Sequence, residues 1–122
     1  MDKSSLVEVG RTIVKGLQNG GVPLVAALWV REAMDEQWLL WISPKSFTGR
    51  TNFYASLANV LTKLRAQTGY FEISNVRAIE PTNAIVYDLK RFGKVNPDHP
   101  MFLQSVSLSG VYLKEGVLLY VE

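Results

Sequence analysis

The stretch "VPLVAALWV" at residues 22–30, followed by "WLLWI" at residues 38–42, decides the fold of this chain. Both runs are short and rich in valine, leucine and tryptophan, and residues 33–36 between them look like a turn. They predict two strands of a hairpin, over residues 24–30 and 38–42. Neither run alternates apolar with polar residues, and a strand that is apolar on both faces is covered on both faces. We therefore expect this hairpin to be enclosed by helices of the same chain or by a second copy.

The spacing of apolar residues predicts three helices. The first covers residues 5–18, is opened by a capping box from Ser5 to Glu8, and stops at glycines 20 and 21. A second apolar stripe runs from Phe53 to Leu64 and ends near Thr68. The ambiguous segment 83–92 fits a helix better than a strand, with Thr82 or Asn83 as its cap and Gly93 as its stop.

Three further strands are expected downstream of the hairpin. Residues 73–80 form the first of them, and Pro81 ends it. Residues 105–113 and 117–121 form the other two, joined by the loop Lys114-Glu115-Gly116. The order helix, strand, strand, helix, strand, helix, strand, strand predicts an α+β fold. We expect one domain over residues 1–122, with a mostly antiparallel sheet of about five strands and three helices.

The composition restricts the classes of function. Hydrophobic residues make up 48% of the 122 residues and charged residues only 20%, which suggests that a partner covers some apolar surface. The longest apolar run has nine residues, against roughly 20 for a membrane span, and the first five residues do not begin a secretory signal. The chain has no cysteine, which makes the reducing cytoplasm the expected location. The net charge of +2 is too small to argue for a nucleic-acid partner.

Three segments resemble a group of small uncharacterised bacterial proteins. These are "VPLVAALWV" with the following "QWLLWISP", then "IEPTNAIVYDLKRF", and finally "SGVYLKEGVLLYVE". The resemblance spans most of the chain and implies that the middle segment is a capped helix, but it implies no activity, cofactor or partner. In the group the loop after the second strand tends to be acidic, whereas here it holds Lys45 and Arg50. The strand pair followed by a helix is also similar to the start of GAF, roadblock and other profilin-like sensor or scaffold domains.

The loop "SPKSFTGRTN" at residues 43–52 is the one candidate anion site. Backbone amides at a helix start, together with nearby cations, can hold an anion. The candidate residues are Lys45, Thr48, Gly49, Arg50 and Thr51. A P-loop needs an upstream glycine that is absent here, and it has lysine where this chain has arginine. The favoured interpretation is a connector in which Thr48 or Thr51 caps the next helix and Gly49 eases the turn.

Other chemical groups are scattered. His99, beside Asp98, lacks the further partners that a catalytic triad or a zinc site requires. No two carboxylates are spaced for paired acid–base chemistry. Lys63, Arg65, Lys90, Arg91 and Lys94 could together form a basic surface, but no nucleic-acid-binding motif accompanies them, and nucleic-acid binding is a minority hypothesis. The sequence thus predicts no catalytic residue, no metal ligand and no cofactor.

Three tryptophans in the hairpin remain as candidate interface residues. Trp29, Trp38 and Trp41 lie on both faces of adjacent strands, so some point into the core and others point to the opposite side. Either the three helices divide and cover both faces, or one face, or the C-terminal edge strand, meets a second copy. We expect a non-enzymatic interaction or scaffold module that self-associates as a homodimer. The alternatives are a small ligand- or anion-binding domain that uses residues 45–51, and a weak nucleic-acid binder.

Overall fold

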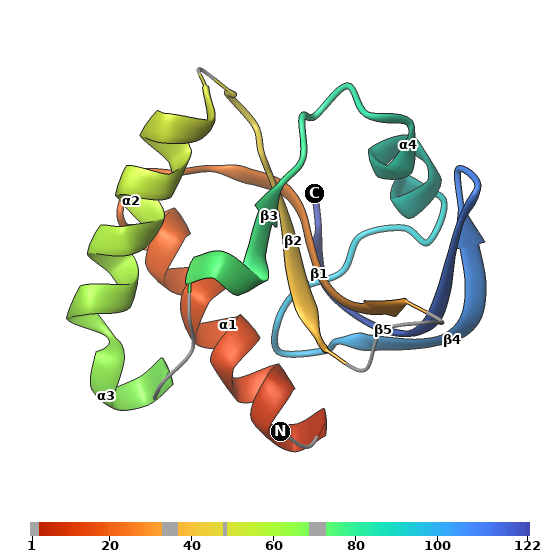
Figure 1. Ribbon diagram of the computed structural model, residues 1–122, viewed down its shortest axis with the longest axis horizontal. Helices are drawn as coiled ribbons and strands as arrows, with labels where there is room; N and C mark the ends of the chain where they lie inside the picture. Colours follow the sequence, from red (N-terminus) through yellow and green to blue (C-terminus); the bar gives the residue numbers. More distant parts are fainter. Residues whose placement is uncertain (1–2, 33–36, 48, 69–72) are drawn as a thin grey trace.

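The computed structural model describes residues 3–32, 37–47, 49–68 and 73–122, without the side chains of residues 50–51 and 67–68 (Figure 1). The helices are α1 (Lys3–Asn19), α2 (Arg50–Lys63), α3 (Arg65–Thr68) and α4 (Ala84–Lys90), with a short 3-10 turn at Ile73–Asn75. The strands are β1 (Leu24–Glu32), β2 (Leu39–Pro44), β3 (Val76–Ala78), β4 (Met101–Leu108) and β5 (Val111–Val121). The predicted order of elements is confirmed, with α3 as a short continuation of α2.

One five-stranded sheet, in the order β3-β2-β1-β5-β4, joins the strands. Neighbouring strands are antiparallel except β2 and β3, which are parallel. The predicted α+β class with a mostly antiparallel sheet is therefore confirmed. β1 lies at the centre of the sheet, between its hairpin partner β2 and the last strand of the chain, β5.

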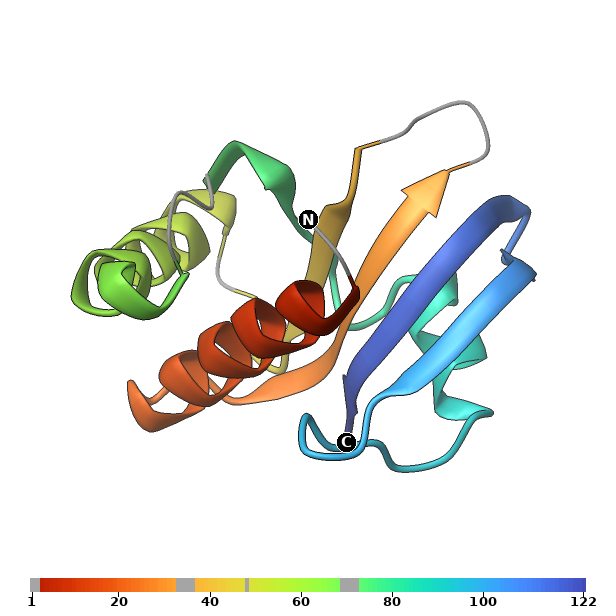
Figure 2. The same ribbon diagram turned by 90° about the horizontal axis from the view of Figure 1, so that it is seen from below.

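Helices cover the sheet from two sides, as Figures 1 and 2 show. α1, α2 and α3 lie on one face, which we call the α1–α2 side, and α4 lies on the other, the α4 side. The core on the α1–α2 side includes Leu6, Ile13, Leu17, Trp29, Leu40 and Leu119. The core on the α4 side includes Leu28, Val30, Trp41, Leu89, Leu113 and Leu118. Within the described residues no helix has the length and hydrophobicity needed to cross a membrane.

The hairpin of β1 and β2 is enclosed on both faces, as its sequence predicted. Every residue from Leu24 to Val30 is buried, and so is every residue from Leu40 to Pro44. Leu24 packs on the α1–α2 side although simple alternation placed it with Ala26 and Leu28, because a bulge between Leu24 and Ala26 shifts the register. Helices of the same chain therefore cover the hairpin, without a second copy.

Local signals at helix ends account for most of the helix boundaries. α1 ends as predicted in a Schellman motif, in which the N–H of Val22 donates to the Leu17 carbonyl at 2.9 Å and Gly21 has φ of 85°. α1 begins at Lys3, so Ser5 lies inside the helix and the predicted capping box does not open it. Asn83 caps α4 by accepting from the Ile85 N–H at 2.9 Å, as predicted.

The C-terminal hairpin turns at a different place from the predicted one. The expected loop Lys114-Glu115-Gly116 lies inside β5, and the turn is Ser109-Gly110. Both turn residues have positive φ, 50° and 85°, which is the backbone of a two-residue type I′ hairpin turn. The prediction of the loop was therefore wrong: β5 is longer than expected, and β4 lies earlier in the chain, at Met101–Leu108. The predicted strand at 73–80 is also shorter, because only Val76–Ala78 pairs with β2.

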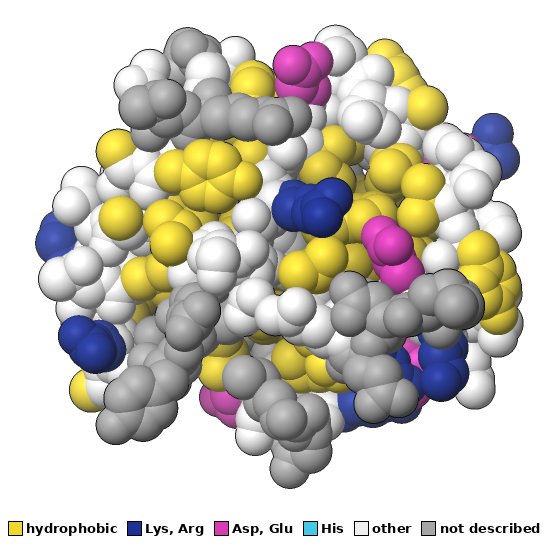
Figure 3. Space-filling model, in the orientation of Figure 1, with side chains coloured by type: hydrophobic (Ala, Val, Ile, Leu, Met, Phe, Trp, Pro, Cys, Tyr) yellow, Lys and Arg dark blue, Asp and Glu magenta, His cyan; other side chains and the backbone are white. Residues whose placement is uncertain are grey.

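The two edges of the sheet differ in length and charge. β3 has three residues, and Arg77 in its middle is exposed. Figure 3 shows hydrophobic side chains on the face around β3, with basic and acidic side chains among them. β4, at the other edge, has eight residues, "MFLQSVSL", and none of them is charged. A short, charged edge resists pairing with another strand, and a longer uncharged edge does not.

Candidate functional site

The loop at residues 43–52, which the sequence predicts as a candidate anion site, contains a lysine that is already paired with a carboxylate. Lys45 Nζ lies 2.6 Å from Glu122 Oε1, and this hydrogen bond raises the pKa of Lys45 and lowers that of Glu122. Thr48 lies outside the described residues, as do the side chains of Arg50 and Thr51. An anion at this loop would compete with the Glu122 carboxylate for Lys45.

Gly49 is the N-cap of α2. Its φ of 131° and ψ of 152° would strain any other residue, and a glycine has no side chain that could cap the helix. The prediction that Thr48 or Thr51 caps this helix concerns Thr48 and the side chain of Thr51, which lie outside the described part of the chain, so it stays a prediction. The prediction that the five loop residues bind an anion stays a prediction.

A polar groove lies between the end of α1 and one face of α2. It consists of two adjoining cavities of about 370 Å³ and 190 Å³, which share Val22 and Ser56 as lining residues. The larger cavity is lined by Asn19, Asn59 and Lys63 as well as by apolar side chains, and the smaller one reaches Gly49 at the start of α2. We call this the α1–α2 groove.

One stripe of α2 supplies the polar wall of the groove. Asn52, Ser56, Asn59 and Lys63 follow one another at intervals of three or four residues, so they lie on one side of the helix. Across the groove, α1 approaches α2 closely at Gly16, where an added Cβ would lie 2.7 Å from Leu64 Cδ1. This stripe was not predicted, although its helical spacing is readable in the sequence.

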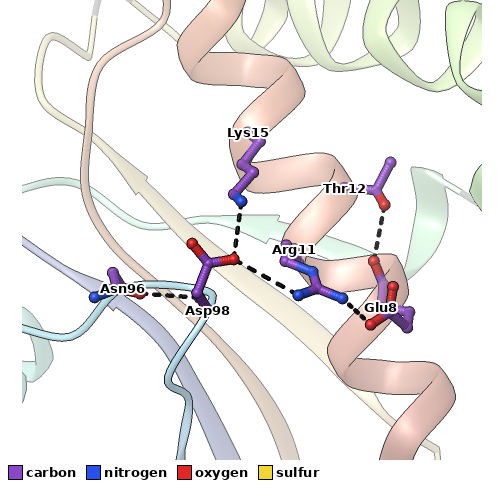
Figure 4. A network of polar contacts seen from close by, with 6 residues as sticks. All are labelled: Glu8, Arg11, Thr12, Lys15, Asn96 and Asp98. Atoms are coloured by element: carbon purple, nitrogen blue, oxygen red, sulfur yellow. Dashed lines mark hydrogen bonds and ion pairs between the residues drawn. The ribbon is translucent and has the colours of Figure 1, made fainter.

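His99 and its neighbour Asp98 lie in the loop before β4, where Asp98 contacts α1 (Figure 4). Lys15 Nζ lies 2.9 Å and Arg11 Nη1 3.6 Å from Asp98 Oδ1, and Arg11 also pairs with Glu8. The hydrogen bond from Lys15 lowers the pKa of Asp98. The Asp98 carboxylate is therefore paired with these cations and not with the His99 imidazole. The contacts hold the loop against α1. Within the described residues no three histidine or acidic side chains gather as a metal site.

The five basic residues named from the sequence do not share a surface. Lys63 and Arg65 belong to α2 and α3 on one side of the sheet, whereas Lys90, Arg91 and Lys94 belong to α4 and the residues after it, on the other side. The sheet separates the two groups. A single basic patch built from all five residues is therefore absent.

The three tryptophans occupy different environments in the hairpin. Trp29 is 1% exposed on the α1–α2 side, and its indole N–H donates to the Leu6 carbonyl at 2.8 Å. Trp41 is 5% exposed on the α4 side, and its N–H has no hydrogen-bond partner in the described part of the chain. Trp38 is half-buried beside the Arg31 guanidinium, 5.6 Å from the ring centre. A partner would reach Trp29 or Trp41 only if the covering helices moved, and the predicted tryptophan interface stays a prediction.

Hydrophobic side chains are exposed instead on the C-terminal hairpin. Phe102 is 55% exposed, Tyr112 47% and Met101 36%. Phe102 borders a shallow hollow of about 510 Å³ against the first turns of α1, which cover only part of β4 and β5 (Figure 2). We call the edge of β4, with these three side chains, the β4 surface. This surface was not predicted, because the expected strand began at residue 105, after Met101 and Phe102.

Comparison with known proteins returns no relative. No family model, no curated protein and no solved structure matches the chain.

Proposed function

We propose that this chain is a non-enzymatic interaction module that self-associates through the β4 surface. The observation that supports the proposal is an eight-residue, uncharged edge strand flanked by the exposed side chains of Met101 and Phe102. Such an edge offers free backbone hydrogen-bonding groups to another strand. The opposite edge, with three residues and the exposed Arg77, does not offer the same opportunity.

A second copy of this chain is the partner that the β4 surface fits best. Two copies related by a two-fold axis would place β4 antiparallel to itself, and no like charges would then face each other, because β4 has no charged residue. The positive φ of 51° at Ser105 interrupts the extended backbone. We therefore expect the pairing to run along Met101 to Gln104.

Burial of aromatic surface would supply most of the affinity. Full burial of a phenylalanine side chain stabilises by about 1.5–3 kcal/mol, and a stable dimer buries roughly 800 Å² on each copy. Pairing of four backbone residues covers less than that. The dimer is therefore expected to include Phe102 and the hollow between β4 and α1, where Val7 and Pro100 add apolar contacts.

Sedimentation of the purified protein at micromolar concentration tests the proposal. We expect a species of twice the 13.7 kDa chain mass. Phe102→Lys should weaken the dimer by at least about tenfold, because it places a charge in the buried edge. The matched control is Tyr87→Lys, since Tyr87 on α4 is 60% exposed but lies on the other side of the sheet. A wild-type protein that sediments as one chain would refute the proposal, and so would equal weakening by both substitutions.

We place the dimer in the cytoplasm. The chain has no cysteine to form disulfides, and a reducing compartment imposes no need for them. A scaffold or accessory role follows from self-association, since pairing at one edge brings two copies of every other surface together.

A further inference from the structure

We propose that the α1–α2 groove binds a small hydroxylated anion, of the class of sugar phosphates and sugar acids. The larger cavity, of about 370 Å³, falls within the size range of small-molecule sites, roughly 300–1,000 Å³. It lies on one chain, away from the β4 surface, so this proposal is independent of the self-association proposed above.

The polar lining of the groove matches hydroxyl groups. The carboxamides of Asn19 and Asn59 each present donors and an acceptor, and the hydroxyl of Ser56 can do both. None of these three side chains makes a hydrogen bond within the described part of the chain. A ligand with several hydroxyls could bond to all of them without displacing a protein contact.

The charge of the groove selects an anion. Lys63 is the one ionisable side chain among the described residues that line the two cavities, and no carboxylate faces it there. Lys63 forms no ion pair within the described residues, in contrast to Lys45, which Glu122 neutralises. A phosphate or carboxylate at this end of the groove would gain a charge-assisted hydrogen bond.

The apolar part of the lining and the spacing along α2 fit a sugar-sized molecule. Val22, Val60 and Leu64 line the same cavity and offer contacts to the C–H face of a sugar ring. Asn59 and Lys63 are four residues apart, which is about 6 Å along the helix axis. That separation lets one residue bind a ring hydroxyl while the other binds an anionic group on the exocyclic carbon.

Titrations followed by amide NMR shifts test the proposal with four probes: glucose 6-phosphate, glucuronate, glucose and inorganic phosphate. We expect the two hydroxylated anions to shift the amides of Asn19, Ser56, Asn59 and Lys63, and glucose and phosphate to bind at least about tenfold more weakly. Glucuronate and glucose 6-phosphate distinguish a carboxylate from a phosphate on the same exocyclic carbon. No groove shifts with either anion, or equal binding of inorganic phosphate, would overturn the proposal.

Three variants assign the contacts. Lys63→Ala should weaken the binding of the hydroxylated anions by about tenfold, while Asn59→Ala should weaken anions and glucose alike. Lys114→Ala is the matched control, because Lys114 is an exposed lysine of β5 outside the groove. The Phe102→Lys variant should retain full binding. Unchanged affinity in Lys63→Ala, or an equal loss in Lys114→Ala, would show that the charge of the groove does not select the ligand.

Discussion

Gly10 lies in α1 where the helix crosses the sheet, and a side chain has no room there. A Cβ at this position would come within 2.4 Å of Leu119 Cδ1 and 2.7 Å of Trp29 Nε1. Neither neighbour is free to move, because Leu119 is buried and the Trp29 indole is held by its hydrogen bond to the Leu6 carbonyl. The close approach of α1 to the sheet therefore depends on this glycine.

We predict that Gly10→Ala destabilises the protein. Helix propensity alone favours alanine by about 1 kcal/mol, whereas overpacking a core costs about 1–3 kcal/mol, so packing outweighs propensity. Urea denaturation should show a lower free energy of unfolding. In the double variant Gly10→Ala, Leu119→Ala the two losses should be less than additive, because the truncated leucine makes room. Stabilisation by Gly10→Ala would contradict the close approach.

For single residues, the sequence predicts roles within the residue's own helix or strand. It does not predict roles that depend on contact with a distant segment. The cap Asn83 and the stop Gly93 were predicted because both act on the adjacent helix. Gly10 gave no local signal, and the helical spacing of Asn59 did not by itself indicate a groove, since the two positions depend on Leu119 and on α1.

Among the secondary-structure elements, the C-terminal hairpin contains a glycine that resembles a turn residue in the sequence but lies inside a strand. Gly116 follows two charged residues and resembles a turn, but in β5 it allows close approach of the neighbouring strand. An added Cβ would lie 3.3 Å from the Trp29 carbonyl oxygen. Glu115 pairs across the sheet with Arg31. Glu115 therefore belongs to a cross-strand ion pair and not to a turn. The turn lies at Ser109-Gly110, where the Ser109 hydroxyl also donates a hydrogen bond to Asp88 at 2.7 Å.

We predict that Gly110→Ala destabilises the hairpin and that Gly110→Asn does so less. Gly110 has φ of 85°, where alanine is strained by about 1–2 kcal/mol and asparagine is better tolerated. Thermal unfolding of the two variants measures the difference. Equal midpoints for both variants and the wild type would place the turn elsewhere.

Across the whole molecule, acidic side chains connect elements that are distant in the sequence. Asp98 bonds to α1 and Asp88 to the turn of the last hairpin, while Glu122 joins the last residue to the end of β2. Glu115 lies between Lys3 of α1 and Arg31 of β1. The Lys3 ammonium, which bonds to Glu115, and the Arg31 charge lower the pKa of Glu115. Partner groups likewise lower the pKa of the other three.

We predict that stability is lost in acid. A carboxyl whose pKa is lower in the folded state stabilises the fold above its unfolded pKa, and that contribution disappears as the pH falls through the folded value. The ordinary values are 3.8 for aspartate and 4.5 for glutamate. The unfolding midpoint should therefore be nearly constant from about pH 7 to 5 and should fall below about pH 4.5. Glu115→Gln should lower the midpoint at neutral pH and converge with the wild type in strong acid. A midpoint that rises on acidification would contradict these contacts.

The outline of the architecture was predictable, because the hydrophobic pattern of a strand indicates whether one or both of its faces are buried. The two-sided apolar hairpin had to be covered on both faces, by helices or by a second copy, and the structure places α1 and α2 on one face and α4 on the other. Two strand pairings were not predictable: the parallel pairing of β2 with β3 and the antiparallel pairing of β1 with β5. Both pairings join distant segments whose own sequences do not specify a neighbour.

The pairing of β1 with β5 has a consequence for biosynthesis. β1 emerges from the ribosome early, yet one of its two neighbours begins only at Val111. A nascent chain that stops before this residue leaves one backbone edge of β1 unpaired, together with the apolar side chains of Leu24 to Val30 that β5 helps to bury. Synthesis should therefore leave an aggregation-prone intermediate until β5 has emerged from the ribosome, and chains stalled before β5 should recruit chaperones more strongly than chains that include it.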